Sequence, residues 1–411
     1  MRMKGSQPDP STTPADRPIW LRQSTLRLKP AQSPYGFILQ EEAHGYPTAS
    51  SLAEAILKHQ QARSIQHVWT PESETLILIE ECPDLLPSLQ PIRMAEAQDD
   101  LRSTRYKAVV GAAVITGIGI IEYGKLGGAV HRSGTLGIAI VVYLMFALVP
   151  YYQAYKALRT ARKLSKETLA EEARDIRFDY WTEKQPGYFT KGLLAIIILL
   201  SALQFLSPIL TPLRSGFNDT VQLAGLNKGA ILAGEGWRIW TAPFLHGNWV
   251  HLFMNASALW YIGRRVEVLT KWPNLLLCYL ISIIAGAYAS YYFLPMGKSA
   301  VGASGGLMGL MGFLLVFELL HPRLAPRPAR RRLIAGIVLT GVIGLLGYQF
   351  IDNAAHIGGL LAGIAYGYLG FRRSDTVQRP RLVLADYLIG GAALLILTGA
   401  ALFTARKLLG W

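Results

Sequence analysis

Gly302-Ala303-Ser304-Gly305 opens a long apolar run of this 411-residue chain and is its most informative motif. A second stretch, Ala355-His356-Ile357-Gly358-Gly359, opens a later apolar run in the same way. Polar side chains with reactive atoms are costly inside a bilayer, so they indicate a functional site by default. Together the two stretches predict nucleophilic chemistry within a polytopic membrane protein.

The composition also indicates a membrane protein. The chain is 51% hydrophobic and its mean hydropathy is +0.27. A spanning helix needs about 20 mostly apolar residues. We predict nine spans, at 107–123, 134–153, 191–210, 246–263, 274–294, 303–320, 333–350, 354–371 and 383–404.

The charge does not indicate a nucleic-acid partner. A net charge of +14 would suit nucleic acid, but most Lys and Arg lie in loops beside the apolar runs. This is the distribution that the positive-inside rule produces, so we expect the lipid bilayer and no nucleic acid as a partner. Cys82 and Cys278 are too few to build a disulfide framework. No cleavable signal peptide is visible, and we expect the first span to act as the export signal.

The chain is predicted to be mainly α-helical, with a small soluble region before the membrane segments. Four strongly apolar or charged sections follow that region. The predicted parts are a disordered N-terminus (1–33), a small soluble α+β domain (34–106), a transmembrane helix pair (107–153), a charged cytoplasmic linker (154–190), a six-helix core (191–371) and an extra C-terminal transmembrane helix (372–411). The linker is expected to be either a solvated, partly helical connector or a segment that touches anionic lipid heads.

The soluble domain is predicted to combine three strands with one helix. The strands are expected at 35–39, 65–69 and 74–79, the last two joined by a Thr-Pro-Glu-Ser turn. The helix is expected at 50–63, with Ser50 or Ser51 as its N-cap and Glu54 placed for a capping box. No motif in this domain indicates chemistry.

Basic clusters predict the topology. They follow the fourth, sixth and eighth runs, at 264–271, 323–332 and 372–381, and should be cytoplasmic. Nine spans then place the soluble domain in the cytoplasm as well. Arg406 and Lys407 would lie outside, which departs from the rule and leaves the orientation of the last helix open.

This topology brings five polar residues to one depth. The fourth, sixth and eighth runs all begin at the outer face, where we expect His246, His251 and Asn255 of the fourth run, Ser304 of the sixth and His356 of the eighth. Charge counting did not use these residues. Their agreement is therefore independent support for one shared site.

The residue types in this set suit nucleophilic catalysis. A serine hydroxyl needs a base to remove its proton, and a neutral imidazole such as that of His356 has a suitable pKa. Ser304 opens a helix, where unpaired backbone N–H groups favour an oxyanion, and Gly302 and Gly305 flank it for a tight turn and close backbone approach.

The fourth run supplies further donors for an oxyanion. His251 and Asn255 stand four residues apart and share one helix face. His246 is either an additional donor or a residue that holds the loop in shape.

Structural explanations exist for each of these residues taken alone. A serine in an apolar helix commonly bonds its own backbone, and a histidine commonly satisfies a neighbour. His251 and Asn255 could join helices, and His246 with His251 could bind a metal, although no third ligand has zinc-like spacing. Glycines repeat every four residues from Gly359 and from Gly305, which predicts close packing of these two helices.

At this point the chain strongly resembles the rhomboid intramembrane serine proteases. The resemblance covers about residues 191–371, with 383–404 as an added seventh helix. Gly302–Gly305 is similar to the family's Gly-x-Ser-Gly, and 355–359 to its histidine helix. His246, His251 and Asn255 match its second core helix. Trp237-Arg238, in the loop 213–243, matches a Trp-Arg element of its first loop.

The resemblance implies a Ser304/His356 dyad with no acidic third member. It implies an oxyanion site from His251, Asn255 and the Ser304 backbone, with no metal or organic cofactor. The implied activity is serine endopeptidase hydrolysis of peptide bonds in or near the transmembrane segments of membrane-protein substrates. The implied location is a multi-pass position in a membrane, which we expect to be a prokaryotic plasma membrane.

Met308 and Asp352 lie close to the Ser304 and His356 motifs in the sequence. Met308 stands where the family often carries an aromatic ring that stacks on the histidine, and Asp352 is expected to cap the helix of His356 rather than orient its ring. One alternative is a non-catalytic rhomboid-like binder of membrane helices, which should have lost the serine or the histidine. The other is a transporter, which should carry an inverted repeat or charged midplane residues.

Overall fold

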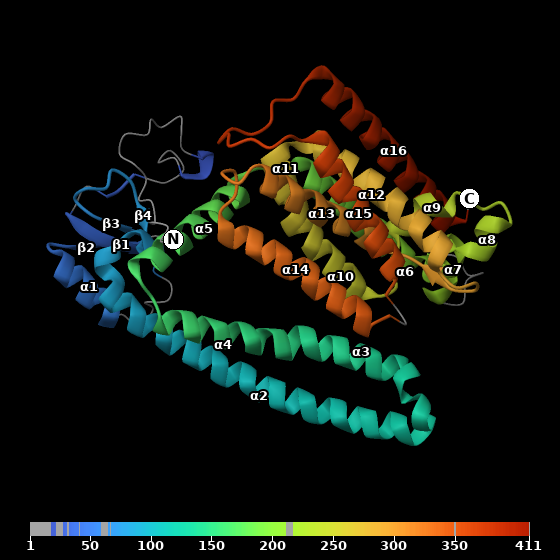
Figure 1. Ribbon diagram of the computed structural model, residues 1–411, viewed down its shortest axis with the longest axis horizontal. Helices are drawn as coiled ribbons and strands as arrows, with labels where there is room; N and C mark the ends of the chain where they lie inside the picture. The colour runs from blue at the N-terminus through green and yellow to red at the C-terminus, as the bar shows by residue number, and fades with distance from the viewer. Residues whose placement is uncertain are drawn as a thin grey trace. The chain divides into compact units, whose positions relative to one another are not determined.

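The structure is a computed structural model of the whole chain, and it is mainly helical (Figure 1). It describes residues 18–21, 28–30, 33–40, 42–58, 65, 67–210, 217–348 and 351–410. The chain forms two compact units, Met1–Trp181 and Thr182–Trp411. The predicted fold class, a mainly α polytopic membrane protein with a small N-terminal α+β region, is confirmed.

The first unit contains a four-stranded antiparallel sheet in the order β2-β1-β3-β4. Its strands are β1 (Tyr35–Leu39), β2 (Glu42–Tyr46), β3 (His67–Trp69) and β4 (Ile77–Leu78). The strand predicted at 35–39 is confirmed, whereas the one predicted at 74–79 is only two residues long and ends in a 3-10 turn. The sequence analysis missed β2, because this edge strand is mostly exposed and lacks alternating apolar residues.

Helix α1 (Ala49–Lys58) begins at a different cap from the one predicted. Thr48 is the capping residue: the Ser51 N–H donates to Thr48 Oγ1 at 3.1 Å, and the Thr48 N–H donates to Ser51 Oγ at 3.2 Å. The prediction of Ser50 or Ser51 as N-cap with a Glu54 capping box is therefore wrong. Glu54 instead pairs with Lys58 one turn later. The predicted end of this helix, 59–63, lies outside the described residues.

Helix α2 (Leu86–Leu126) joins the soluble region to the membrane without a break. Its first turns place Leu89 in the soluble core beside Phe37 and Leu52, and its second half is apolar. The predicted boundary at 106/107 therefore falls inside one continuous helix. Sequence analysis placed it there because only the apolar half of the helix has the composition of a span.

The predicted linker 154–190 is more than a solvated connector. It contains helix α5 (Lys166–Lys184), which buries Leu169 in the core of the soluble region and buries Phe178 and Trp181 as well. Arg93 of α2 pairs with Glu172 of α5 at 3.0 Å and also with Glu80. Burial raises the pKa of Glu80, and Arg93 opposes that shift.

Most of the N-terminal segment predicted to be disordered, 1–33, lies outside the described residues. Its described part includes a 3-10 turn, Ile19–Leu21. Trp20 in this turn is buried with its ring edge against Phe178, at 5.8 Å between ring centroids. Disorder is therefore the wrong prediction for this turn.

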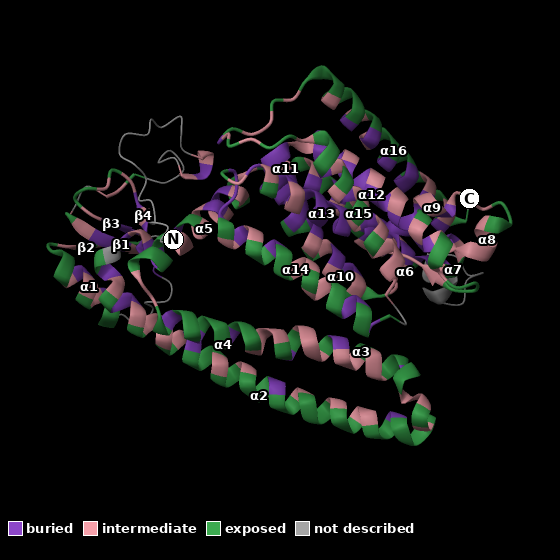
Figure 2. Ribbon diagram, viewed as in Figure 1, coloured by how far each residue is buried: buried purple, intermediate pink, exposed green. Residues whose placement is uncertain are grey.

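An apolar hairpin completes the first unit. Its arms are α2 and the continuous stretch of α3 (Gly134–Tyr143), a π-helical turn (Leu144–Leu148) and α4 (Val149–Arg162). Figure 2 shows that the residues of these arms are mostly exposed or intermediate, in contrast to the buried centre of the second unit. Exposed apolar side chains along two long helices suit a lipid environment.

Among the residues that the structure describes, five helices are long and apolar enough to cross a membrane. They are Leu86–Arg132, Gly134–Arg162, Tyr188–Ser207, Trp272–Phe293 and Leu384–Leu409. The helices in the other four predicted runs, 246–263, 303–320, 333–350 and 354–371, are not both long enough and apolar enough to be included. One of them, Ser304–Leu320, is apolar but short. The others carry charged or polar residues or many glycines, such as the arginines in the first turns of the helix Arg327–Leu346.

The second unit is built around α13 (Ser304–Leu320), which is buried along most of its length. Helices α12 (Trp272–Phe293) and α15 (Asn353–Gly370) pack against it. The remaining long elements are α6 (Tyr188–Leu210), α10 (Trp249–Ala258), a π-helical turn (Leu259–Gly263), α11 (Arg264–Thr270), α14 (Arg327–Leu346) and α16 (Leu384–Leu409).

Glycines allow α13 and α15 to touch through their backbones. A Cβ atom on Gly359 would lie 1.9 Å from the Gly305 carbonyl oxygen, and one on Gly363 would lie 1.8 Å from that of Gly309. No side chain fits into such a contact. The close packing predicted from the four-residue glycine repeats is confirmed.

A buried ion pair lies near the opposite end of α13 from Ser304. Arg265 Nη2 and Glu318 Oε1 are 2.6 Å apart, and both side chains are almost fully buried. Arg265 Nη1 also donates to the Ala329 carbonyl oxygen at 3.1 Å. The pair therefore joins α11, α13 and α14.

We expect Glu318→Ala to destabilise the second unit strongly. Removing one partner of a buried pair leaves an uncompensated charge, which typically costs about 3–5 kcal/mol. The double variant Arg265→Met/Glu318→Leu removes both charges and should recover most of the loss. Thermal unfolding of the purified protein in detergent measures both effects, and equal melting temperatures for the single variant and the parent would contradict this prediction.

Candidate functional site

Ser304 is the first residue of α13, and a strained turn delivers it there. Gly302 has a φ of +129°, a conformation that favours glycine. Its N–H donates to the Ala242 carbonyl oxygen at 3.0 Å, which fixes the turn to the preceding loop. The N-terminal backbone N–H groups of α13 therefore point away from the helix beside the Ser304 hydroxyl.

His356 lies in the first turn of α15 and meets Ser304 directly. The distance between His356 Nε2 and Ser304 Oγ is 2.8 Å, a normal hydrogen bond. The two residues are 52 positions apart in the sequence, and the backbone contact between α13 and α15 brings them together. A hydroxyl and an imidazole in this arrangement can exchange a proton.

Asp352 caps the helix of His356. Its Oδ1 accepts a hydrogen bond from the Ala355 N–H at 3.1 Å, and its Oδ2 accepts one from Ser290 Oγ of α12. The N-cap role predicted for Asp352 is confirmed. Because Ser290 holds the cap, α12 also contributes to the position of α15.

His251 and Asn255 lie against the turn that precedes Ser304. A Cβ atom built on Gly302 would be 2.7 Å from His251 Cε1 and 3.5 Å from Asn255 Nδ2. Asn248 caps their helix, α10, by accepting a hydrogen bond from the His251 N–H at 2.8 Å. The three segments predicted to share one site therefore meet in the structure.

His246 connects this region to α6. Its Nε2 lies 3.0 Å from Asn255 Nδ2, and its Nδ1 lies 2.9 Å from Ser201 Oγ. An amide nitrogen only donates, so His246 Nε2 accepts from Asn255 and Nδ1 donates to Ser201. Of the two roles considered for His246, this geometry favours the one that holds the loop in shape.

Gln204 completes the support of His246. Its amide group exchanges two hydrogen bonds of 2.9 Å with the backbone N–H and carbonyl of His246. Ser201 and Gln204 were missed in the sequence analysis. The available signal was weak: two polar residues, three positions apart, inside the apolar run 191–210. The other alternative for His246 and His251, a metal site, finds no group of three potential ligands among the described residues.

A small cavity of about 40 Å³ adjoins Ser304. Its wall includes Gly302, Ser304, Gly305, Ser290 and Asp352. Gly305 approaches α15 here, since a Cβ on it would lie 3.3 Å from the Ala355 carbonyl oxygen. A small group bound in this cavity would lie next to the Ser304 hydroxyl.

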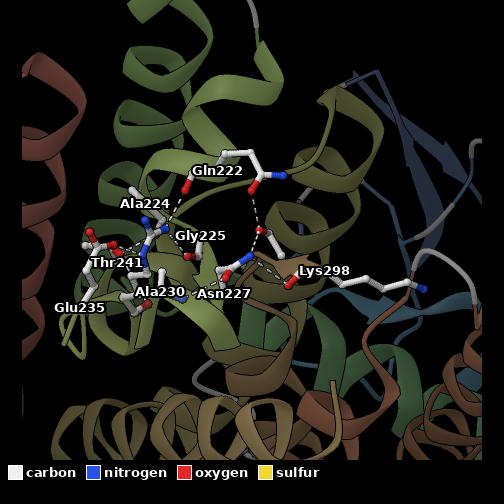
Figure 3. A network of polar contacts seen from close by, with 10 residues as sticks. Gln222, Ala224, Gly225, Asn227, Ala230, Glu235, Thr241 and Lys298 are labelled. Atoms are coloured by element: carbon white, nitrogen blue, oxygen red, sulfur yellow. Dashed lines mark hydrogen bonds and ion pairs between the residues drawn. The ribbon is translucent and has the colours of Figure 1, made fainter. Parts of the chain in front are cut away.

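Trp237 and Arg238 do not line this cavity. They lie in the segment between α6 and α10, and Arg238 holds this segment together through hydrogen bonds. Figure 3 shows the polar network around Gln222, Gly225 and Glu235. Arg238 Nη1 donates to the carbonyl oxygens of Gln222 at 2.7 Å and Gly225 at 2.8 Å, and its Nε pairs with Glu235 at 2.6 Å. The Arg238 guanidinium is therefore a structural anchor for α7 (Phe217–Ala224) and α9 (Arg238–Thr241).

A two-stranded ladder links the same loop to the segment before Ser304. Strands β5 (Leu226–Asn227) and β6 (Ser299–Ala300) pair antiparallel. The side chain of Asn227 donates to Ser299 Oγ at 3.2 Å, and Ser299 Oγ donates to Gln222 Oε1 at 3.1 Å. The loop and the turn at Gly302 are thereby held in one frame.

We expect Gly302→Ala to abolish the reactivity of Ser304. The added methyl group would overlap His251 and force an unfavourable φ, and a misplacement of about 1 Å can cost about 10²-fold in rate. Labelling of Ser304 by a fluorophosphonate measures the effect. Gly234→Ala is the matched control, because Gly234 has a φ of +102° with open space around it. Equal labelling of the Gly302→Ala and Gly234→Ala proteins would contradict the prediction that Ser304 requires glycine at position 302.

The fold and the site define a polytopic helical membrane domain in which a serine and a histidine meet between two tightly packed helices. Residues 233–373 match the family model described as the rhomboid domain. The chain therefore contains a rhomboid domain, and the resemblance inferred from its motifs is confirmed for this region.

Similar curated proteins include one that is named a protease and others that are named inactive. The chain is 33% identical to rhomboid protease GluP of Bacillus subtilis over 213 residues, which is 50% of this chain and 40% of that protein. It is 38% identical to RHOMBOID-like protein 6, mitochondrial, of Arabidopsis thaliana over 145 residues, or 34% of this chain and 46% of that protein. It is 33% identical to inactive rhomboid protein 2 of Homo sapiens over 159 residues, or 37% of this chain and 18% of that protein. The chain thus spans less than half the length of these relatives.

Proposed function

We propose that this protein is an intramembrane serine endopeptidase. The observation that carries the proposal is the 2.8 Å hydrogen bond between His356 Nε2 and Ser304 Oγ at the N-terminus of α13. The substrates are membrane proteins, cleaved in or near a transmembrane segment. The relative named a protease and the rhomboid domain support this assignment.

In the first half of the reaction, Ser304 attacks the carbonyl carbon of the scissile peptide bond. His356 Nε2 accepts the hydroxyl proton as the Oγ–C bond forms, and the carbonyl oxygen becomes an oxyanion. The tetrahedral intermediate then collapses, the C–N bond breaks, and His356 returns the proton to the leaving amine. The product of this half is an ester between Ser304 and the acyl part of the substrate.

In the second half, water replaces the amine. His356 takes a proton from the water molecule as its oxygen attacks the ester carbonyl, and it returns that proton to Ser304 Oγ as the C–O bond breaks. The carboxylic acid product leaves and the free serine is restored. A dyad completes this cycle without an acidic third residue, because the neutral imidazole is itself the base.

Three donors are placed for the oxyanion: the Ser304 backbone N–H, His251 and Asn255. Asn255 has two amide hydrogens, and His246 engages one of them. The second hydrogen is free to serve substrate, while His246 fixes the direction of the amide. Removal of one oxyanion donor typically lowers kcat by about 10²–10³.

The orientation of the protein is part of the proposal. The basic clusters support an orientation with the N-terminal unit in the cytoplasm and with the ends of α10, α13 and α15 that carry the site at the outer face. Substrate segments and water would then reach Ser304 from that face. We propose a prokaryotic plasma membrane as the location.

The alternative function is a non-catalytic binder of membrane helices. A relative named an inactive rhomboid protein is as similar in identity to this chain as the named protease is. The present chain retains both Ser304 and His356 at bonding distance. This pair is the feature that favours the protease over the binder.

The deciding test is cleavage of a single-span substrate in liposomes. We expect the parent protein to cleave, and Ser304→Ala and His356→Ala to lose activity to the limit of detection, because each removes one member of the dyad. Ser257→Ala is the matched control, since Ser257 is an exposed serine on α10. Cleavage by Ser304→Ala would reject Ser304 as the nucleophile. A parent protein that binds the substrate helix without cutting it would support the binder.

Asp352→Asn separates a helix cap from a catalytic acid. Asparagine caps helices about as well as aspartate, so we expect kcat to stay within about tenfold of the parent. Asp352→Ala removes the cap and should lower thermal stability as well as activity. A thousandfold loss in Asp352→Asn would instead show that the charge itself acts on His356.

A further inference from the structure

The last helix, α16, ends against the loop that supports the site. Lys407 Nζ lies 4.9 Å from the centre of the Trp237 ring, and the guanidinium carbon of Arg238 lies at the same distance from that ring. The Phe403 ring meets Trp237 at an angle, with centroids 5.8 Å apart. The final turns of α16 therefore contact Trp237 of the Trp-Arg element.

Leu408 makes a second contact with the same loop. Its side chain is fully buried, in an apolar cluster with Ala224 and Leu245 to which Trp237 also belongs. Leu245 directly precedes His246 in the sequence. The end of α16 thus shares one apolar cluster with Trp237 and Leu245, which lie near the two ends of the segment 237–246.

The rest of α16 is seated firmly enough to transmit this contact. A Cβ on Gly390 would lie 2.5 Å from Pro273 Cβ at the start of α12, so the two helices touch closely there. Ala393, Leu397 and Ala401 are buried farther along the helix. Because α16 packs on the rest of the second unit along its length, the position of its last turn is well defined.

The segment 237–246 reaches the site at two points. The Ala242 carbonyl oxygen accepts the Gly302 N–H two residues before Ser304, and His246 bonds to Asn255. A shift of this segment would therefore displace both the turn that carries the nucleophile and the amide placed for the oxyanion. Neither Lys407 nor Leu408 lines the cavity beside Ser304.

We propose that Lys407 and Leu408 are positioning residues that hold the segment 237–246 in register with Ser304 and Asn255. The cation and the apolar side chain act together: Lys407 lies against the Trp237 ring, and Leu408 belongs to the buried apolar cluster that includes Leu245. This role also explains why the chain keeps a lysine at the helix end where the charge rule predicts few cations. The effect on catalysis rests on the proposed protease function, whereas the effect on the loop does not.

Hydrogen–deuterium exchange and cleavage kinetics on the full chain test the proposal together. We expect Leu408→Ala and Lys407→Gln to speed amide exchange in 222–246 at least tenfold and to lower kcat about tenfold to a hundredfold with little change in KM, as misplaced groups do. Lys407→Arg should restore both, because arginine keeps the cation beside the ring.

The matched controls are Leu409→Ala and Arg406→Gln, which alter exposed neighbours on the same turn. They should leave exchange and kcat unchanged. Exchange in α13 monitors folding: faster exchange throughout the second unit would show a general structural role and overturn the proposal. Unchanged exchange in 222–246 would also overturn it. If the parent cleaves nothing, the protease assignment fails, and the exchange experiment still decides whether α16 holds the loop.

Discussion

The backbone contact between α13 and α15 is the constraint on which the rest of the second unit depends. A methyl group at Gly359 or Gly363 would overlap a carbonyl group of α13. Without that contact, the side chains of Ser304 and His356 could not reach each other, because they stand at the first turns of two separate helices. In a membrane, where lipid tails compete equally for apolar side chains, such close contact is a main source of helix association. The same glycines therefore hold the domain together and place its reactive pair.

A second requirement is that every polar side chain brought into this environment finds a partner. His246, Ser201, Gln204 and Asn255 form a continuous set of hydrogen bonds around the loop before α10. An unpaired polar group would be costly there. The set fixes the tautomer of His246 and leaves one hydrogen of the Asn255 amide for another partner. The need to pair buried polar groups and the proposed oxyanion role of Asn255 are thus met by the same arrangement of side chains.

The first unit follows different physical rules. Its sheet and helices bury an ordinary apolar core, whereas its hairpin presents apolar side chains outward along two long helices. Helix α2 takes part in both, since its first turns belong to the core and its later turns to the hairpin. The core of the sheet-containing region and the first arm of the apolar hairpin are therefore joined by one rigid element, α2. Helix α2 is continuous across residues 106 and 107. Composition alone predicted a domain boundary there, because only the second half of the helix is apolar.

Composition and short motifs are sufficient to predict several features of this protein. These are the membrane class, the positions of the apolar helices, the Ser304 and His356 motifs and the glycine repeats, because hydropathy, spacing and side-chain chemistry are written along the chain. The pairing of polar residues depends on the tertiary structure. Ser201, Gln204 and Ser290 carry at most a weak local signal, as polar residues inside apolar runs, and they act through neighbours that lie 42 to 62 positions away. The tertiary structure also decided that α5 belongs to a core and that α16 ends on Trp237. Such contacts between distant segments depend on how helices pack, and no property of either segment alone specifies them.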